Sequence, residues 1–400
     1  MIKVKMYPAK NGDCFLISIG KENKRHILID SGYVETYEKF LKRDLIEINA
    51  VGEKINLMII SHIDEDHILG ALNFIEENNK KNIIQIEEVW FNSYRHLEVD
   101  RQAGKLSEQE KNLLKSEISL GKSFVKRITE KGVEHTDISA RQGSTLGALL
   151  MQGNYKWNYS FKGLAISSNN KLQIELNDIS INVISPNDTK LERLKNKWLK
   201  ELKKKKWNFK ISKDKLFDDA YEFMLLMDQE STVEHSEISK GTENDAISIV
   251  EAATKEDETL DCSVTNGSSI AVMIEYDKKR LLFLADAHPD IIYESLMGME
   301  ISNFDLVKLP HHGSKKNMTL KLAKLLKSEI YLVSTNGDKH LHPDLEAIAK
   351  IIYSHSKVPK KFYFNYETLT SKQLNETSLR NQYNYGQIIG SGERAIEIEL

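Results

Sequence analysis

Residues 59–70 read Ile-Ile-Ser-His-Ile-Asp-Glu-Asp-His-Ile-Leu-Gly. The apolar run 55–60 predicts a buried strand that stops at Ser61. Side chains that can bind a metal ion follow immediately: His62, Asp64, Asp66 and His67. Imidazole and carboxylate groups hold divalent ions and leave coordination positions for water. The stretch therefore predicts a metal site directly after a buried strand.

A capped helix start is the alternative interpretation of the same stretch. Asp64 or Asp66 would then cap the helix, with Glu65 in its first turn. That alternative accounts for one or two acidic residues, but not for the flanking His62 and His67. The metal site is the better account of the whole pattern.

Composition limits the classes of protein to consider. The chain has 400 residues, 40% of them hydrophobic and 29% charged, with a net charge of −3. This length suits one large α/β domain with an insertion, or two domains, and any nucleic-acid contact must come from a local basic patch. The two cysteines, Cys14 and Cys262, fit a reducing compartment, so we expect a cytoplasmic protein. No apolar run approaches ~18 residues, so we expect no membrane span.

Ligand-type side chains also follow other predicted strands. They are Asp30 after strand 26–30, Asp286 after strand 280–284, His311 and His312 after strand 305–309, and His342 after strand 330–334. Each alone could be a cap or a turn residue. Together they favour a site, because sites in α/β proteins assemble at strand ends. Asp30 could also act as an acceptor that orients a metal-bound histidine.

Residues 188–261 differ from the rest in charge. The part from 188 to 215 has 12 Lys or Arg against 4 Asp or Glu, and the part from 216 to 261 is acidic. We expect a charged, largely helical insertion in a domain formed by 1–187 and 262–400. Residues 188–215 could contact nucleic acid, 188–261 could bind a protein partner, or the charges could simply be solvated. Trp198 and Trp207 could stack on bases or anchor packing.

In this order the motifs resemble the metallo-β-lactamase-fold superfamily of hydrolases. The motifs are Asp30-Ser31-Gly32, the residues from His62 to His67, the strand ending at Asp286, and Pro310-His311-His312-Gly313-Ser314. They are most similar to the branch found in the extracytoplasmic domain of competence DNA-uptake channel proteins (ComEC-like). The resemblance covers roughly 1–187 and 262–345. It implies an α/β fold, a four-layer αββα sandwich of two mixed β-sheets.

The resemblance also implies a ligand set for one or two divalent ions. One position would have His62, Asp64 and Asp286, and the other would have Asp66, His67, His312 and the bridging Asp286. Asp64 stands where most of the superfamily has histidine, and no Gly-His-Thr motif occurs near 260–270. A carboxylate in place of an imidazole favours Mn²⁺ or Mg²⁺ over a pure zinc pair, although zinc stays a candidate.

The expected activity follows from the resemblance. In the similar branch the substrate is a phosphodiester, so we expect a metal-dependent phosphodiesterase or nuclease that uses a metal-activated water. Asp66, His342 and His311 are the candidate catalytic residues, with His342 favoured over His311 as the group that contacts the phosphate or protonates the leaving oxygen. Two alternatives remain: hydrolysis of a small ester, lactone, thioester or cyclic nucleotide, and a partner-binding module with a vestigial site.

Overall fold

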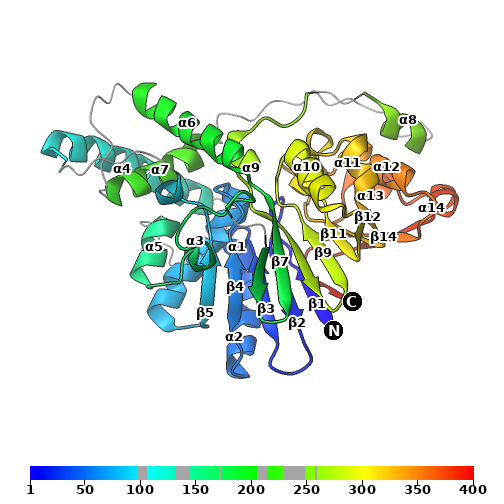
Figure 1. Ribbon diagram of the computed structural model, residues 1–400, viewed down its shortest axis with the longest axis horizontal. Coiled ribbons are helices and arrows are strands. Elements are labelled where there is room, and N and C mark those ends of the chain that lie inside the picture. Colours follow the sequence, from blue (N-terminus) through cyan, green and yellow to red (C-terminus); the bar gives the residue numbers. More distant parts are fainter. Residues whose placement is uncertain (98–105, 131–144, 171–172, 205–214, 229–247, 257–258) are drawn as a thin grey trace. The chain divides into compact units, whose positions relative to one another are not determined.

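The computed structural model describes residues 1–97, 106–130, 145–170, 173–204, 215–228, 248–256 and 259–400. These residues form two compact units. The first unit consists of 1–13, 167–186 and 234–400, and the second consists of 14–166 and 187–233. Each unit contains its own β-strands and helices (Figure 1).

An eight-stranded mixed sheet organises the first unit, in the order β15-β14-β13-β11-β9-β8-β7-β6. Its strands are β6 (Gln173–Leu176), β7 (Ile179–Ser185), β8 (Ala271–Tyr276), β9 (Lys279–Phe283), β11 (Leu306–Lys308), β13 (Ile330–Val333), β14 (Lys360–Phe364) and β15 (Tyr385–Ile389). Within the described residues, β6 forms an antiparallel pair with β7, and β8 forms one with β9.

Parallel pairing brings the candidate residues of this unit to one edge. β9, β11 and β13 are parallel neighbours. Their carboxyl ends therefore meet at the same edge of the sheet. Asp286 follows β9, His311 and His312 follow β11, and His342 lies beyond β13. The sequence placed each residue at a strand end, and the strand order explains why these ends are neighbours.

Helices cover the eight-stranded sheet (Figure 1). The helical elements are α8 (Ile249–Thr254), α9 (Val264–Gly267), α10 (Pro289–Met299), η5 (Pro310–Gly313), η6 (Lys315–Asn317), α11 (Leu320–Leu325), α12 (Leu345–Ser354), α13 (Leu369–Gln373) and α14 (Thr377–Tyr383). Leu282, Val307 and Tyr331 of the strands form one buried cluster with Ile292 of α10 and Ile348 of α12. Each such side chain contributes roughly 1.5–3 kcal/mol by leaving water, so this core fixes the sheet edge that carries the site.

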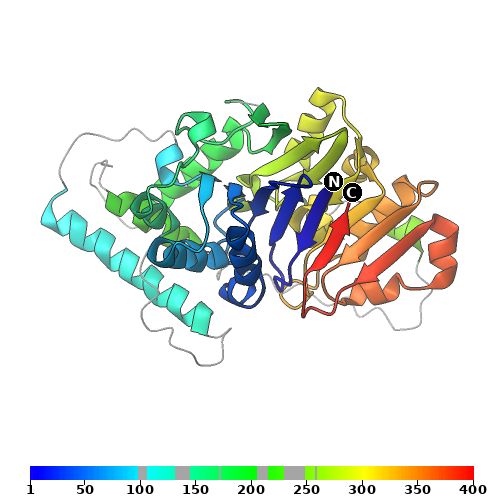
Figure 2. The ribbon, with the colours of Figure 1, turned by 90° about the horizontal axis from the view of Figure 1, so that it is seen from below.

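Four further strands belong to the first unit, as two pairs. β10 (Asn303–Phe304) pairs in parallel with β12 (Lys327–Ser328). β1 (Ile2–Met6) pairs antiparallel with β16 (Ile396–Glu399). Figure 2 shows the labelled N- and C-terminal ends beside each other as a result of this pairing.

The second unit has strands β2 (Phe15–Ile19), β3 (Arg25–Ile29), β4 (Ile55–Ile59) and β5 (Ile86–Trp90). β2 pairs antiparallel with β3, whereas β3, β4 and β5 are parallel. The helical elements are α1 (Val34–Thr36), η1 (Tyr37–Leu41), α2 (Lys42–Ala50), α3 (Glu65–Lys81), η2 (Tyr94–His96), α4 (Glu108–Glu130), α5 (Leu146–Gln152), η3 (Tyr159–Phe161), α6 (Asp188–Lys204) and α7 (Lys215–Asp228). Asp30 and Ser61 therefore lie at the ends of two adjacent parallel strands.

Helices α6, α7 and α8 are the described parts of the predicted insertion 188–261. Trp198 of α6 is buried, with its ring 5.7 Å from that of Tyr94 and 5.2 Å from that of Tyr221. This tryptophan is therefore a packing anchor rather than a surface for bases, while Trp207 lies outside the described residues. α8 places Ile249 and Ala253 in the core of the first unit. The boundaries of the insertion stay a prediction.

The predicted α/β class, with two mixed sheets and accompanying helices as in the metallo-β-lactamase fold, is confirmed. None of the helices in the described parts of the chain combines the length and the apolar character needed to cross a bilayer.

Candidate metal centre

The loop between β4 and α3 carries the first set of candidate ligands. α3 begins at Glu65, so Asp64 occupies the position before the first helical residue. The Asp64 side chain makes no capping hydrogen bond there. Its Oδ2 lies 3.5 Å from Nε2 of the buried His62. The capped-helix interpretation thus predicts the helix start but not the orientation of this carboxylate.

Hydrogen bonds define which nitrogen of each histidine in this loop carries the proton. The Asp30 carboxylate accepts from the Ser61 backbone N–H at 2.7 Å and from the Ser61 hydroxyl at 2.7 Å. Nδ1 of His67 lies 2.9 Å from the same carboxylate, which can only accept, so Nδ1 is the donor. The Ser61 hydroxyl donates its only hydrogen to the Asp30 carboxylate. Its oxygen therefore accepts a hydrogen bond from Nδ1 of His62 at 2.9 Å.

In the neutral ring, both histidines therefore have their lone pair on Nε2, the form in which imidazole binds a metal. Their ring centroids are 4.3 Å apart. Oδ1 of Asp66 lies 3.9 Å from Nε2 of His67. The prediction that Asp30 orients a histidine of this loop is thus supported by a direct contact with His67.

Gly70 allows this close packing. A Cβ at this position would lie 2.1 Å from the backbone oxygen of Ser31. The Gly70 N–H also donates to the Gly32 carbonyl at 2.7 Å. A larger residue would push α3 away from the turn that holds Asp30, so the glycine maintains the distance between Asp30 and His67.

The first unit holds a second set of candidate ligands at its sheet edge. Nε2 of His312 lies 3.5 Å from Oδ2 of Asp286, and its Nδ1 donates to the Ser334 carbonyl at 2.8 Å. The third member is Asp13, whose Oδ1 is 3.5 Å from Nδ1 of His312. One ligand atom from each of these three buried residues lies within 4.8 Å of the other two. Imidazole and carboxylate donors this close suit a divalent cation.

Charge at this cluster is balanced in part by Lys308. Its ammonium is buried, pairs with the Asp13 carboxylate, and donates to the Ala285 carbonyl at 3.1 Å. The same nitrogen is 3.9 Å from Oδ1 of Asp286. Burial disfavours the charged form of His312, but the charges of Asp286 and Asp13 outweigh it and raise its pKa. Two carboxylates against one lysine leave an environment that attracts positive charge.

His311 lies near Oδ2 of Asp286, whereas Lys308 lies near Oδ1 of the same carboxylate. Its Nδ1 donates to Oδ1 of Asn317 at 2.8 Å and is 3.4 Å from Oδ2 of Asp261, while its Nε2 is 3.6 Å from Oδ2 of Asp286. Burial opposes protonation of His311, but the nearby carboxylates of Asp286 and Asp261 raise its pKa to about 9.

His342 lies next to His311, with a centroid distance of 5.5 Å. Its Nδ1 is 3.3 Å from Oδ2 of Asp344. Burial, aided by the positive charge of His311, lowers the pKa of His342 despite the hydrogen bond to Asp344. The two histidines therefore favour opposite protonation states at neutral pH.

The structure thus gathers the predicted residues into one set per unit. His62, Asp64, Asp66 and His67 lie together with Asp30, and Asp286, His311, His312 and His342 lie together on the first unit. Sequence reasoning missed Asp13 and Asp261. Asp13 stands directly before an apolar strand, and an acidic residue at that position is a usable signal. Asp261 had no such signal, because its neighbours His311 and Asn317 are about fifty residues away in the sequence.

Part of the chain matches a known protein family. Residues 7–143 match the model described as the metallo-beta-lactamase superfamily. This match supports the superfamily and a fold of the metal-hydrolase type, whereas the channel-protein branch is not distinguished by it. No match to a curated protein sequence was found.

Solved structures give weak likenesses. A Zn²⁺-bound PqqB from Methylobacterium extorquens aligns over 100% of both chains with 11% identity and a TM-score of 0.36. A CmlA beta-hydroxylase variant aligns with 9% identity and a TM-score of 0.35, and this chain covers 54% of its length. A diphosphatase from the PhnP family covers 32% of this chain and 42% of its own, with 18% identity and a TM-score of 0.15. Likeness at this level carries no functional argument.

Proposed function

We propose that the chain is a metal-dependent phosphodiesterase, most specifically a nuclease. The observation that carries the proposal is that three histidines use the same ring nitrogen, Nδ1, for a hydrogen bond within the protein. His62, His67 and His312 each direct Nδ1 to an acceptor, namely the Ser61 hydroxyl, the Asp30 carboxylate and the Ser334 carbonyl. In the neutral ring, each therefore has its lone pair on Nε2, as a metal ligand requires.

The proposed ligands keep the assignment made from the sequence resemblance. His62, Asp64 and Asp286 would hold one ion, and Asp66, His67, His312 and Asp286 the other; Asp13 is added here as a candidate ligand. The sharing of Asp286 by ligands of both units rests on the resemblance alone. Zinc, manganese and magnesium are all compatible with the donor types.

A divalent ion bound by such residues lowers the pKa of coordinated water from ~16 toward ~7 and neutralises phosphoryl oxygen charge. The protein residues have complementary roles in this proposal. Asp66 orients the attacking water. His311 presents Nε2 to the substrate, since its Nδ1 is engaged by Asn317. His342, held by Asp344, is the second group able to contact the phosphate.

Nucleic acid is the proposed partner, in part through the basic segment 188–215. In its described part, α6 buries Leu191, Leu194 and Trp198 and leaves Arg193 and Lys200 exposed. An apolar face that packs and a basic face in solvent permit contact with phosphates without loss of the fold. A protein partner for 188–261 and a cytoplasmic location stay predictions.

The proposal is tested with a hydrolysis panel in Zn²⁺, Mn²⁺ or Mg²⁺. The substrates are single- and double-stranded DNA, RNA, cyclic nucleotides and bis-p-nitrophenyl phosphate, with a lactam and a thioester as controls. We expect cleavage of the polynucleotides and of the small phosphodiester. Hydrolysis of only the lactam or the thioester would overturn the phosphodiester assignment.

The ligand role of the β4–α3 loop is tested by Asp66→Ala, with Glu65→Ala as the matched control. Glu65 is the adjacent acid in the same first turn of α3. We expect Asp66→Ala to lower activity by a thousandfold or more, roughly 4 kcal/mol in the barrier, and to lower bound metal measured by mass spectrometry. Unchanged activity and metal content in Asp66→Ala would remove this mechanism.

A further inference from the structure

A lysine-rich pocket lies on the first unit, beyond the candidate ligands. It is a shallow surface hollow with a cavity volume of about 10 Å³. Its charged lining residues are Lys255, Lys315, Lys316, Lys350, Glu256 and Glu346. Four ammonium groups against two carboxylates give the lining a net positive charge. The proposed function assigns nothing to this pocket.

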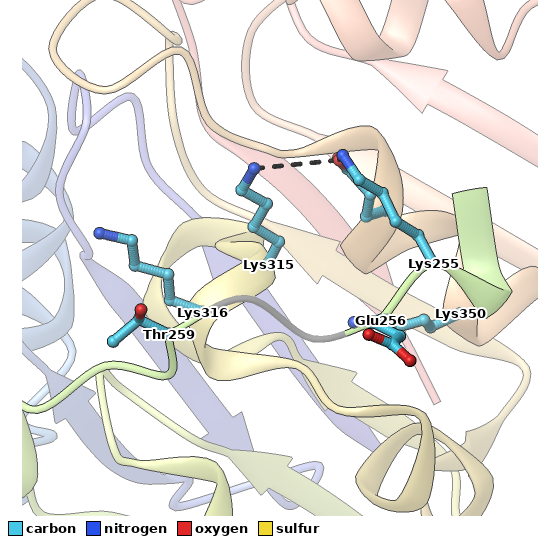
Figure 3. Close-up of a pocket in the computed structure, with 7 residues that line it drawn as sticks. Lys255, Glu256, Thr259, Lys315, Lys316 and Lys350 are labelled. Carbon is cyan, nitrogen blue, oxygen red and sulfur yellow. Dashed lines mark hydrogen bonds and ion pairs between the residues drawn. The ribbon is translucent and has the colours of Figure 1, made fainter. Parts of the chain in front are cut away.

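The lysines come from three parts of the chain, and two of them lie near one carboxylate. Figure 3 shows Lys315 and Lys316 on one side of the pocket and Lys255 and Lys350 on the other. Nζ of Lys255 is 3.4 Å and Nζ of Lys315 is 3.9 Å from Oε1 of Glu346. Such long pairs between partly exposed groups stabilise by less than about 1 kcal/mol each. Glu346 therefore holds these lysines near each other without preventing them from binding a stronger anion.

One lysine is part of the folded framework. Lys350 of α12 is buried, and its Nζ donates to the Met318 carbonyl at 2.8 Å. This contact links α12 to the segment after η6. The pocket wall is therefore fixed, whereas Lys255 and Lys316 present exposed ends to solvent.

The pocket is directly connected to the candidate catalytic residues. Lys315 and Lys316 follow the turn that holds His311 and His312 after a single intervening Gly-Ser step. The Lys316 carbonyl accepts from the Asp261 N–H at 3.1 Å, and Asp261 contacts His311. Lys315 is three positions after His312 in the chain, so their Cα atoms are at most ~11 Å apart.

We propose that this pocket binds a phosphate of a polynucleotide strand, a few nucleotides away from the phosphate that is cleaved. The proposal rests on the proposed function, because it adds a backbone subsite to the same centre. Phosphates recur every ~3.4 Å along the axis of a stacked strand, so a separation of at most ~11 Å corresponds to no more than about three nucleotides. Ammonium groups bind phosphate as point charges and need no exact hydrogen-bond geometry. The subsite would favour polynucleotides over isolated phosphodiesters.

The test measures binding without catalysis. A fluorescein-labelled thymidine oligonucleotide of about ten residues is titrated with protein in EDTA, over a range of KCl concentrations, and anisotropy is recorded. We compare wild type with the double variant Lys255→Gln/Lys316→Gln. The matched control is Lys361→Gln/Lys372→Gln, which removes the same charge from exposed positions of the same unit. For the pocket variant, we expect weaker binding and a log Kd against log salt slope smaller by about 0.7, the value for one phosphate contact of a single strand.

Each outcome decides the proposal. Equal losses of affinity and slope in the pocket and control variants would overturn it, as would an absence of oligonucleotide binding by wild type. Displacement of the oligonucleotide by an equal concentration of inorganic phosphate would show that the pocket takes a free anion, and would also overturn it. Binding in EDTA does not depend on the metal. Binding through the lysines in EDTA, together with no phosphodiester cleavage in the metal-supplemented hydrolysis panel, would contradict the proposed function while leaving the pocket standing.

Discussion

The ligand loop of the second unit (residues 61–67) and the ligand turn of the first unit (residues 310–317) present the same kinds of side chain in different ways. The loop gathers its ligands within one short stretch, and one carboxylate, Asp30, orients it from the adjacent strand. The turn supplies only His311 and His312, and its partners Asp13, Asp261, Asp286 and Ser334 come from distant segments. Ligands that are adjacent in the sequence can be predicted from the sequence. Ligands from distant segments can be grouped only when the order of the strands is known.

The ligand turn and the ligand loop also differ in backbone conformation. His311 and His312 both have positive φ, 44° and 55°, and Gly313 continues at 83°. Left-handed conformation costs a non-glycine residue roughly 1–2 kcal/mol. Such strain persists at functional sites where the surrounding structure determines it. The turn therefore depends on tertiary contacts for its shape, while Asp64, just before α3, has ordinary extended angles of −106° and 145°.

The largest expected effect concerns the assembled turn. Replacing Lys308 with Met leaves the buried carboxylates of Asp13 and Asp286 without their ammonium partner. Breaking a buried ion pair in this way costs about 3 kcal/mol or more, measured as the free energy of unfolding in urea. The control is Lys360→Met, because Lys360 is also buried in a strand of this sheet but donates to the carbonyls of Tyr383 and Asn384. Equal costs for the two variants would show that the carboxylates need no compensation.

A smaller effect is expected at the local loop. Asp30→Asn keeps the size of the side chain but removes a carboxylate that accepts from Ser61 and His67. Loss of an orienting partner typically lowers metal affinity roughly 10–100-fold, which competition with a chromophoric chelator measures. Glu77→Gln is the control: it neutralises a buried acid on α3 that accepts from Tyr37 and Lys42 instead. An unchanged affinity in Asp30→Asn would mean that the loop orders its histidines without this strand.

The third prediction concerns a buried acid of the second unit that is not a candidate ligand, and its effect depends on pH. Glu222 is buried and accepts from the Gly147 N–H at 3.0 Å and the Ser93 hydroxyl at 3.3 Å. Burial, with the nearby charges of Asp219 and Asp218, raises the pKa of Glu222 to about 8. The folded protein then holds a proton that the unfolded chain releases above its ordinary pKa of 4.5. Stability should fall by about 1.4 kcal/mol per pH unit between those two values.

Glu222→Gln removes this titration while keeping an acceptor oxygen. We expect its advantage over wild type to grow from pH 5.5 to pH 7.5 in urea unfolding. Glu77 provides a control of opposite sign, because its hydrogen bonds to Lys42, Lys81 and Tyr37 outweigh burial and lower its pKa to about 2. Its contribution is present above the unfolded pKa and is lost in acid. Parallel pH profiles for wild type and Glu222→Gln would contradict the raised pKa.

The amino-acid sequence by itself determined the local features of this protein. The apolar run before Ser61, the ligand spacing from His62 to His67 and the strand ends at Asp286 and His312 follow from side-chain type and periodicity, which are properties of short segments. Only the tertiary structure decided that Asp13 and Asp261 join the histidine turn, that Trp198 is a packing anchor, and that Lys308 balances the carboxylates. These contacts join residues far apart in the chain, and their energies depend on burial that no short segment possesses alone.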